Sequence, residues 1–350
     1  MFPCGRPEPD CCRHPAAILP SLNWGSSARI IIRNAEFPQR VARSSLLHAG
    51  LMMNTFLGFV AIVFWSTSIA VARSLTEQLG PMTSASAICL LSGVLGCGYL
   101  LLSGWTLQRL LRLPALYLMG CGALFLLYEV CLYLSIGLAS SREQVLAVGI
   151  INYLWPGLTL LFSLPILGKK AGAWLVPGTV LAFAGAFMAM LQRGSSSSAS
   201  FLAGVREGYV PCLLAFFGAV SWALYSNLSR RWGGDTEGGA VPVFLLASGL
   251  VLAALRPAFA EHPHWAVRPV AELSFIAIVP ALLGYAFWDR AMRRGNVVLI
   301  ASFSYVTPLL STVISCLYLS VPAGPGLWAA CALVIGGAFI CRYSIKDRQA

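Results

Sequence analysis

Apolar stretches of about 20 residues recur along most of the chain, and each is long enough to cross the ~30 Å hydrocarbon core of a bilayer. Only 11% of the residues are charged and 58% are hydrophobic, whereas a soluble domain carries roughly 25% charged residues. The sequence therefore predicts an all-α integral membrane protein with ten transmembrane helices, of which the seventh is the shortest. These helices are expected near residues 54–75, 83–103, 114–140, 143–167, 174–192, 209–229, 240–256, 272–292, 296–320 and 322–342.

The net charge of +11 could indicate a nucleic-acid partner, but the basic residues are scattered between the apolar runs and form no single face. The positive-inside rule explains them better, because cytoplasmic connections collect Lys and Arg. We therefore expect a multi-pass protein of the cell inner membrane, surrounded by lipid, with both termini cytoplasmic and without a nucleic-acid partner. The cations that fall on the inner side are Arg109, Arg112, Lys169, Lys170, Arg230, Arg231, Arg290, Arg293, Arg294, Arg342, Lys346 and Arg348.

The second half of the chain repeats the first. Residues Val145–Phe187 align without a gap to Val297–Phe339, so that Asn152–Pro156 corresponds to Ser304–Pro308. Each half holds five expected helices. Because five is odd, the second copy must enter the membrane from the opposite side, which predicts an inverted-topology repeat, a common architecture of secondary transporters.

This repeat divides the chain into five segments. The basic N-terminal tail has no sustained period and is expected to be disordered; it could be untranslated if translation starts at Met52 or Met53. An external linker separates the two repeats, and a short cytoplasmic tail follows the last helix. The expected boundaries are 1–50 for the tail, 54–192 for the first repeat, 193–208 for the linker, 209–342 for the second repeat and 343–350 for the C-terminal tail.

Pro156 and Pro308 lie inside apolar runs, at corresponding places in the two halves. A proline in a spanning helix removes one backbone hydrogen bond and bends the helix. A bilayer tolerates this only where protein or a wet cavity satisfies the freed carbonyl. We therefore interpret both prolines as hinge or gating positions beside a substrate site.

Aromatic residues with polar tips gather near the expected bilayer centre, although Trp and Tyr normally collect at the membrane interfaces. Helix positions counted at 1.5 Å per residue place Trp65, Trp222, Tyr225, Tyr285 and Trp288 there. As a set they predict an aromatic substrate cage. Taken singly, each could be an ordinary packing residue.

Glu129 is the deepest acidic residue of the expected spans. A carboxylate there costs at least about 2.5–3.5 kcal/mol on insertion scales, so such residues usually face a cavity and mark a pathway. Because burial disfavours its charged form, Glu129 could sense a substrate ammonium or exchange a coupling proton. It could equally be a neutral acid that is hydrogen-bonded to an adjacent helix. Asp289 needs no such role, because an ion pair with Arg293 at i and i+4 accounts for it.

Small residues recur at fourfold spacing in the fifth and tenth expected helices. Gly178, Ala182 and Ala186 lie on one, and Ala332 and Gly336 on the other. Such spacing allows close approach of helix backbones. We favour packing within the chain over a dimer interface, and a self-contained pair of halves predicts a monomer.

No enzyme constellation, cofactor motif or metal site is expected. The histidines are confined to the tail, the start of the first span and one loop, and the cysteines have no metal-ligand spacing apart from the loose Cys11–His14 cluster. Structural zinc sites need four ligands at regular spacings. The cysteines of the helices are most simply small buried apolar residues.

Three motifs carry a resemblance to a known family: Tyr128–Leu132, Asn152–Pro156, and Gly295-Asn296-Val297 with the following Ser304–Pro308. They resemble the aromatic amino acid exporters of the EamA branch of the drug/metabolite transporter superfamily, over roughly residues 54 to 345. The resemblance implies an inverted-repeat carrier that exports Phe, Tyr, Trp and related metabolites by alternating access around a midplane cavity. Together with the aromatic pattern, it gives these candidate substrate-binding residues: Trp65, Tyr128, Glu129, Tyr133, Asn152, Tyr153, Trp155, Trp222, Tyr225, Tyr285, Trp288, Ser304 and Tyr305.

Alternatives remain at this stage. An aromatic cage with a carboxylate suits planar cationic drugs as well as amino acids, so a multidrug exporter of the same fold is the nearest alternative. A channel-like pore or a membrane-embedded enzyme would belong to different classes. The sequence leaves uniport and proton antiport equally open.

Overall fold

The computed structural model describes the chain from residue 24 onward, with short gaps. The expected tail at 1–50, linker at 193–208 and C-terminal tail at 343–350 lie partly outside the described residues. By their internal contacts, residues 49–350 form one compact unit, to which the following description applies. The described residues are 24–104, 106–193, 202, 205, 206, 208–233, 239–318 and 325–346.

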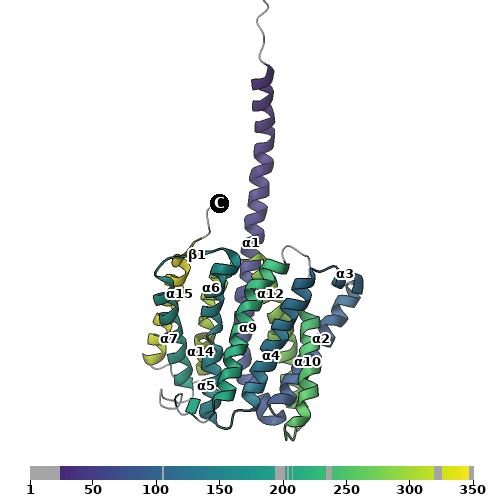
Figure 1. Ribbon diagram of the computed structural model, residues 1–350, viewed down its shortest axis with the longest axis vertical. Coiled ribbons are helices and arrows are strands. Elements are labelled where there is room, and N and C mark those ends of the chain that lie inside the picture. Colours follow the sequence, from purple (N-terminus) through teal and green to yellow (C-terminus); the bar gives the residue numbers. More distant parts are fainter. Residues whose placement is uncertain are drawn as a thin grey trace, which may run out of the picture. The chain divides into compact units, whose positions relative to one another are not determined.

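The described chain is almost entirely helical (Figure 1). Its two short strands, β1 and β2, pair in antiparallel fashion. In chain order the elements are α1 (Trp24–Leu79), α2 (Pro81–Leu102), α3 (Leu107–Leu111), η1 (Leu116–Cys121), α4 (Gly122–Gly137), α5 (Arg142–Asn152), α6 (Trp155–Leu167), β1 (Lys170–Ala171), α7 (Leu175–Arg193), α9 (Tyr209–Gly233), α10 (Val241–Leu255), η2 (Arg256–Ala258), α11 (Val267–Ile276), η3 (Ala277–Gly284), α12 (Tyr285–Arg294), α13 (Val297–Phe303), α14 (Val306–Tyr318), α15 (Pro325–Ser344) and β2 (Ile345–Lys346).

The helix α1 begins earlier than the sequence predicted. Its bounds are Trp24–Leu79, whereas the first span was expected to begin near residue 54. Residues 39–49, which lead up to the first span, contain neither glycine nor proline and include several strong helix formers. The helix of the first span therefore continues backward into the tail.

Seven helical segments within the described residues are long and apolar enough to cross a membrane. Three shorter apolar helices, Leu175–Met188, Val297–Ser311 and Trp328–Ser344, coincide with the fifth, ninth and tenth expected spans. The prediction of an all-α, multi-pass membrane protein is therefore confirmed.

Two of the expected spans are broken near the middle, each at the proline motif. Helix α5 ends at Asn152 and α6 begins at Trp155, whereas α13 ends at Phe303 and α14 begins at Val306. Pro156 and Pro308 fall in the first turn of the second helix of each pair. The backbone N–H groups in the first turn of a helix have no acceptor within that helix, so a proline there removes no intrahelical hydrogen bond. The prolines thus start new helices, and a tight turn separates the two segments of each span.

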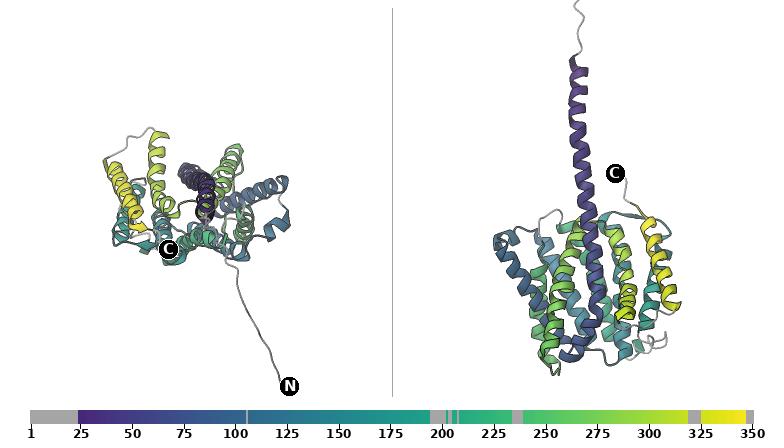
Figure 2. Two further views of the ribbon diagram at one scale, coloured as in Figure 1. Left: turned by 90° about the horizontal axis from the view of Figure 1, so that it is seen from above. Right: turned by 180° about the vertical axis from the view of Figure 1, so that it is seen from behind.

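Corresponding elements of the two sequence halves lie side by side. Helix α2 packs against α10, and α7 packs against α15. Figures 1 and 2 show the α2–α10 pair and the α7–α15 pair at opposite edges of the bundle, with α9 between them. Helix α9 also contacts α4 and α6. The centre of the bundle is therefore built around α9, which carries Trp222 and Tyr225, the first aromatic candidates of the second half.

The close α7–α15 contact depends on glycine. A Cβ added at Gly185 would lie 2.7 Å from the backbone nitrogen of Val334, and one added at Gly178 would lie 2.9 Å from that of Cys341. This confirms that the small residues of the fifth span serve packing within the chain. On α15 the tightest position is Gly337, next to the expected Gly336, because its Cβ would strike the backbone of Ala182.

We expect Gly185→Val to push α7 away from α15 and to lower the free energy of unfolding by about 1–3 kcal/mol, the usual range for overpacking. The matched control is Gly98→Val, because Gly98 has open space around its Cβ position. Thermal unfolding of the purified protein in detergent would measure both. Equal melting temperatures for the two variants would contradict the packing argument.

Candidate functional site

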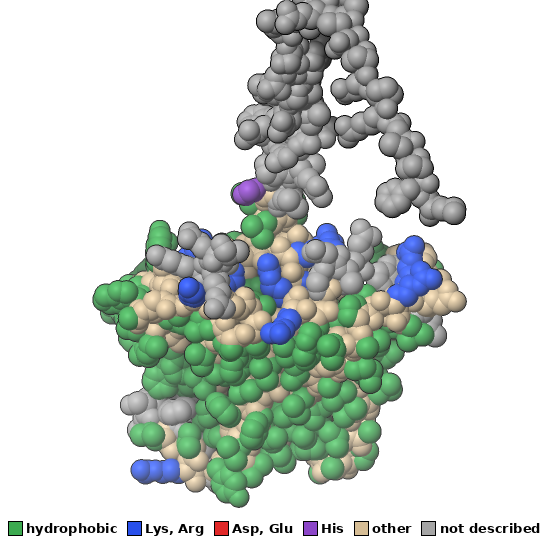
Figure 3. Space-filling model, turned by 45° about the horizontal axis from the view of Figure 1, so that its top comes forward, with side chains coloured by type: hydrophobic (Ala, Val, Ile, Leu, Met, Phe, Trp, Pro, Cys, Tyr) green, Lys and Arg blue, Asp and Glu red, His purple; other side chains and the backbone are tan. Residues whose placement is uncertain are grey.

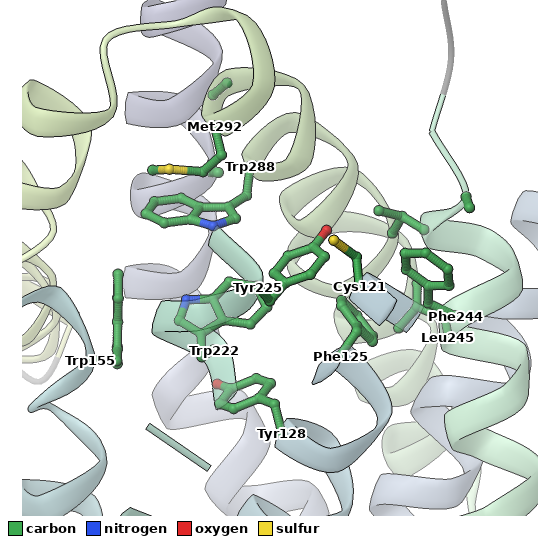
Figure 4. Close-up of a cluster of buried hydrophobic side chains, with 14 of the residues drawn as sticks. Cys121, Phe125, Tyr128, Trp155, Trp222, Tyr225, Phe244, Leu245, Trp288 and Met292 are labelled. Carbon is green, nitrogen blue, oxygen red and sulfur yellow. The ribbon is translucent and has the colours of Figure 1, made fainter. Parts of the chain in front are cut away.

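A cluster of aromatic rings fills the centre of the bundle, with Trp222 of α9 in the middle (Figure 4). The ring centroids of Tyr128 and Trp222 are 4.7 Å apart, and those of Tyr285 and Trp222 are 5.4 Å apart. Trp65, Trp155 and Trp288 lie 5.8, 6.3 and 5.9 Å from Trp222. These six residues come from five different elements, α1, α4, α6, α9 and α12, and the expected convergence of aromatic residues is present.

The turn between α5 and α6 determines where Trp155 lies. Trp155 is the first residue of α6, and its side chain is only 5% exposed. Its ring meets those of Trp65 and Trp288 edge to face, at centroid distances of 6.4 and 5.3 Å. Edge-to-face contacts are a favoured arrangement of aromatic pairs. The broken span therefore delivers an aromatic side chain to the cluster.

A second irregularity holds Trp65. The segment η3 is a π-helix that contains Pro280, and π-helical turns leave room around the backbone and often occur at functional sites. The Trp65 indole N–H donates to the carbonyl oxygen of Pro280 at 3.0 Å. The close approach of the Trp65 indole to this helix requires glycine at position 284, since a Cβ there would lie 2.9 Å from Trp65 Nε1.

Three polar atoms around the rings have no hydrogen-bond partner among the described residues: Glu129 Oε1, Asn152 Oδ1 and Trp222 Nε1. Trp288 differs, because its indole N–H donates to Ser226 Oγ at 3.1 Å. The Trp222 nitrogen lies on the side of its ring toward Trp155 (Figure 4). A buried polar group without a partner costs about 1–3 kcal/mol, which makes these two acceptors and one donor candidates for contact with a ligand.

Glu129 lies at the edge of the ring cluster and is 1% exposed. The Cys89 thiol donates weakly to Glu129 Oε2 at 3.9 Å. The Tyr285 hydroxyl lies within hydrogen-bond reach of the Glu129 carboxyl group, and the hydroxyls of Tyr128 and Tyr133 lie within electrostatic reach of it. Asn152 lies beside the Tyr128 hydroxyl. The polar atoms of Glu129 and Asn152 therefore adjoin the aromatic rings through these tyrosines.

Asp289 belongs to a second polar cluster, next to the rings. Its carboxylate accepts from Arg293 Nε at 2.8 Å, from the Tyr117 hydroxyl at 3.0 Å and from the Tyr225 hydroxyl at 3.0 Å. The expected i, i+4 ion pair is thus confirmed, and both of its side chains are almost fully buried. Tyr225 contributes a ring face to the cluster, while its hydroxyl is engaged by Asp289.

Two of the candidate residues lie elsewhere. Tyr305 is buried with Ala182, Ala186 and Val334, between α7 and α15, and its hydroxyl lies close to Gly157. Ser304 donates its hydroxyl to the Ile300 carbonyl oxygen at 2.9 Å. The second broken span therefore directs its aromatic residue into helix packing, whereas the first directs Trp155 into the ring cluster.

Four residues near the rings were not among the candidates: Phe125, Phe244, Tyr117 and Cys89. Phe125 could have been found, because it lies three residues before Tyr128 and therefore shares its helix face; the two rings of Phe125 and Tyr285 are 5.1 Å apart. Phe244, Tyr117 and Cys89 come from other elements, and no spacing in the sequence connects them to this site.

The fold and the site define an integral membrane protein with a buried aromatic centre, a construction suited to carrying small molecules. The chain belongs to the EamA-like transporter family, whose model matches residues 52–191 and 210–343. The family resemblance expected from the motifs is therefore confirmed.

Named relatives cover most of this chain. The aromatic amino acid exporter YddG of Salmonella typhimurium is 34% identical over 84% of this chain and 98% of its own length. YddG of Escherichia coli is 32% identical over 82% of this chain and 96% of its own length. A solved crystal structure with 29% identity superimposes with a TM-score of 0.68 and covers 83% of this chain and 97% of its own. The named relatives are transporters and not enzymes.

We expect Gly284→Ala to displace the Trp65 indole, because the new Cβ would lie 2.9 Å from Nε1. The near-ultraviolet circular dichroism of the protein should change, since it reports on the packing of the tryptophan rings, while the far-ultraviolet spectrum stays the same. Gly98→Ala, with no neighbour near its Cβ position, serves as the control. An unchanged near-ultraviolet spectrum in Gly284→Ala would refute this role of the glycine.

We expect Arg293→Gln to destabilise the protein by about 3–5 kcal/mol, because it leaves the Asp289 carboxylate buried and uncompensated. Adding Asp289→Asn should recover part of this loss. Arg268→Gln is a matched control, because Arg268 also pairs at i, i+4, with Glu272 at 2.9 Å, but its side chain is 75% exposed; exposed pairs contribute at most about 1 kcal/mol. Chemical unfolding would compare the variants, and equal losses for both arginines would contradict the account.

Proposed function

We propose that this protein is a secondary transporter that exports aromatic amino acids and related small metabolites across the inner membrane. The observation that carries the proposal is the set of unpartnered polar atoms of Glu129, Asn152 and Trp222 beside a buried cluster of aromatic rings. The relatives named as aromatic amino acid exporters support the same substrate class.

The rings would recognise the substrate's side chain. Each good aromatic pair contributes about 0.5–1.5 kcal/mol beyond its buried area. In this structure the rings contact one another, with centroids 4.7 Å apart between Tyr128 and Trp222. A substrate ring would therefore enter by replacing one of these contacts, as the rings around Trp222 move apart.

The unpartnered polar atoms match the charges of an amino acid. A substrate ammonium needs acceptors, which Glu129 Oε1 and Asn152 Oδ1 supply, and a substrate carboxylate needs a donor, which Trp222 Nε1 supplies. Tyr128 and Tyr285 lie between these groups. Tyr133 and Tyr153 would add further hydroxyl groups at the edge of the substrate site.

Ten spans arranged as two inverted five-helix halves would provide alternating access. Support comes from the two separately matched stretches of the family model and from the pairing of α2 with α10 and of α7 with α15. The halves, at 54–192 and 209–342, would rock about the central site. The turns at Pro156 and Pro308 would act as hinges, where the backbone bends as the two halves rock. One chain supplies both halves, so a monomer suffices.

The basic residues support an orientation with both termini in the cytoplasm. Lys and Arg side chains gather on the face that carries the β1–β2 pair and the end of α9 (Figure 3). This distribution is expected for the cytoplasmic side of a membrane protein. Export would then carry substrate from this face to the opposite one.

Counterflow in proteoliposomes tests the proposal. Labelled Phe, Tyr and Trp should exchange saturably, while alanine should not, because it has no ring to occupy the cluster. Running the assay with and without a pH gradient would separate proton antiport from uniport. Exchange of a planar aromatic cation in preference to the amino acids would instead favour a multidrug exporter, and flux without saturation would favour a pore.

We expect Glu129→Gln to transport phenylalanine at least about tenfold more slowly, because a neutral amide loses a charge-assisted hydrogen bond to the ammonium. The loss should vanish for 3-phenylpropionate, which has no ammonium. Trp222→Phe, which keeps a ring but removes the N–H donor, should instead affect phenylalanine more than phenethylamine, which has no carboxylate.

Competition of each analogue with labelled phenylalanine during counterflow would measure these effects. Ser248→Ala is the control, because Ser248 is also buried and unpartnered among the described residues but lies on α10, outside the ring cluster. A Glu129→Gln protein that keeps the wild-type preference for phenylalanine over 3-phenylpropionate would refute the assignment of the ammonium site.

A further inference from the structure

The turn between α1 and α2 is bound by a carboxylate from the second half of the chain. Glu261, between η2 and α11, accepts from the backbone N–H of Met82 at 2.7 Å and from that of Thr83 at 2.8 Å. These N–H groups lie in the first turn of α2, where a helix offers them no acceptor and its dipole favours a negative charge. Arg256 steadies the segment by donating to Thr83 Oγ1 at 3.1 Å and to the Glu261 carbonyl oxygen at 2.9 Å.

A second carboxylate, Glu272 of α11, binds the last turns of α1. Its Oε1 accepts from the Ser74 hydroxyl at 2.9 Å, and its Oε2 accepts from the Gln78 side-chain amide at 3.2 Å. The backbone adds one more bond, because the His264 N–H donates to the Gln78 carbonyl oxygen at 3.0 Å. We call Glu261 and Glu272 the clasp, since together they join the second half to the first half at the α1–α2 turn.

A small apolar cluster connects the clasp to the aromatic rings. Its buried members are Leu75 and Leu79 of α1, Ile88 of α2, Leu273 and Ile276 of α11, and Ala281 of η3. Leu273 directly follows Glu272 of the clasp. Tyr285 packs against the cluster and is also 5.4 Å from Trp222, between ring centroids. Because the cluster draws on both halves, a molecule reaches the rings from this end only when α11 separates from α1 and α2.

Helix α11 is joined to α12 through an irregular segment. The segment η3 is π-helical and contains Pro280, and a proline inside a helix removes a backbone hydrogen bond and favours a bend. Beyond η3, α12 is attached to the first half, because Asp289 accepts from the Tyr117 hydroxyl at 3.0 Å. Bending at η3 therefore moves α11 while α12 stays in place.

The two ends of the bundle differ in how firmly the halves are joined. Asn54, at the other end of the spanning part of α1, accepts from Arg290 Nε at 3.0 Å; it lies about 36 Å from Gln78 at 1.5 Å per residue. Next to Arg290, the Asp289 side chain is 1% exposed, whereas Glu261 and Glu272 are both partly exposed. Breaking a buried ion pair leaves a charge without water, but an exposed carboxylate regains water when its bonds break. The clasp end is therefore the end that opens more readily.

We propose that the clasp and the adjoining apolar cluster form a gate, which opens when α11 bends at η3 and moves away from α1 and α2. The inference rests on the proposed transport function, because a carrier opens its central site to one side at a time. In the proposed orientation the gate lies on the external side, opposite the face on which Lys and Arg gather (Figure 3). Its opening would release the exported substrate.

Two native cysteines make the gate measurable in the full chain. Cys89 lies on α2 beside Glu129 and is 1% exposed. Cys121, which is also fully buried, lies near Asp289 at the other end. The protein in neutral detergent is treated with a cationic, water-soluble methanethiosulfonate reagent, and peptide mass spectrometry gives the labelling rate of each thiol. A buried thiol reacts only while its surroundings are open, so each rate reports the population of the open state at that end.

The variant Glu261→Gln/Glu272→Gln weakens the clasp and preserves the shape of both side chains. An amide has one acceptor oxygen where a carboxylate has two, so at position 261 its NH₂ group would face a backbone N–H of α2. We expect the labelling rate of Cys89 to rise about tenfold or more, because charge-assisted hydrogen bonds are lost. The rate of Cys121 should stay at the wild-type value.

Two further variants complete the test. Ser274→Ala is the matched control and should label as wild type, because Ser274 also lies on α11 but donates to the Val270 carbonyl oxygen within the same helix. Glu272→Gln alone, which leaves Glu261 on α2, should give a smaller rise at Cys89 and serves if the double variant does not fold. Unchanged labelling of Cys89, or an equal rise at Cys89 and Cys121, would overturn the proposal. The labelling needs no substrate, so failure of the gate and failure of amino acid export give different results.

Discussion

The structure depends on one constraint: in an apolar interior, every polar group must find a partner within the protein or be reserved for a ligand. Most backbone N–H and C=O groups find their partners within the helices. Side chains supply further partners. Trp65 donates to the carbonyl of Pro280 in the π-helical η3, and Asn227 donates to the carbonyl of Thr159 on the neighbouring α6. These bonds tie α1 and α9 to other elements through the centre of the bundle.

The same constraint separates the two buried carboxyl groups. Asp289 is surrounded by Arg293 and two tyrosine hydroxyls, so its charge is compensated within the protein. Glu129 has one oxygen without a partner among the described residues and lies next to the aromatic rings. The carboxylate of Asp289 is compensated and supports the fold, whereas we propose that Glu129, which has no cationic partner among the contacts given for it, receives the substrate ammonium. Burial alone does not distinguish these two roles, but the partners do.

Much of the fold was predictable from the sequence, because apolar runs, prolines and the internal repeat act through local physics. The irregularity at Asn152–Pro156 follows from its proline, and the Asp289–Arg293 pair follows from the i, i+4 spacing along one helix. The first residue of α1, Trp24, did not follow, since the apolar pattern gives only the part of the helix that spans the membrane. The repeat also misled in one respect: Tyr305 corresponds to Tyr153 yet packs between α7 and α15, because equivalent positions in two halves need not face the same neighbours. Contacts from other elements, such as Cys89 with Glu129, have no signature in the sequence.

The central claim is that substrate binds between the rings around Trp222 and the polar atoms of Glu129 and Asn152. Photo-crosslinking of 4-azido-L-phenylalanine to the protein in proteoliposomes, followed by peptide mapping, tests it most directly. We expect label in peptides from α4, α6, α9 and α12, displaced by excess phenylalanine but not by alanine. Label confined to other elements, or label that phenylalanine does not displace, would contradict the account.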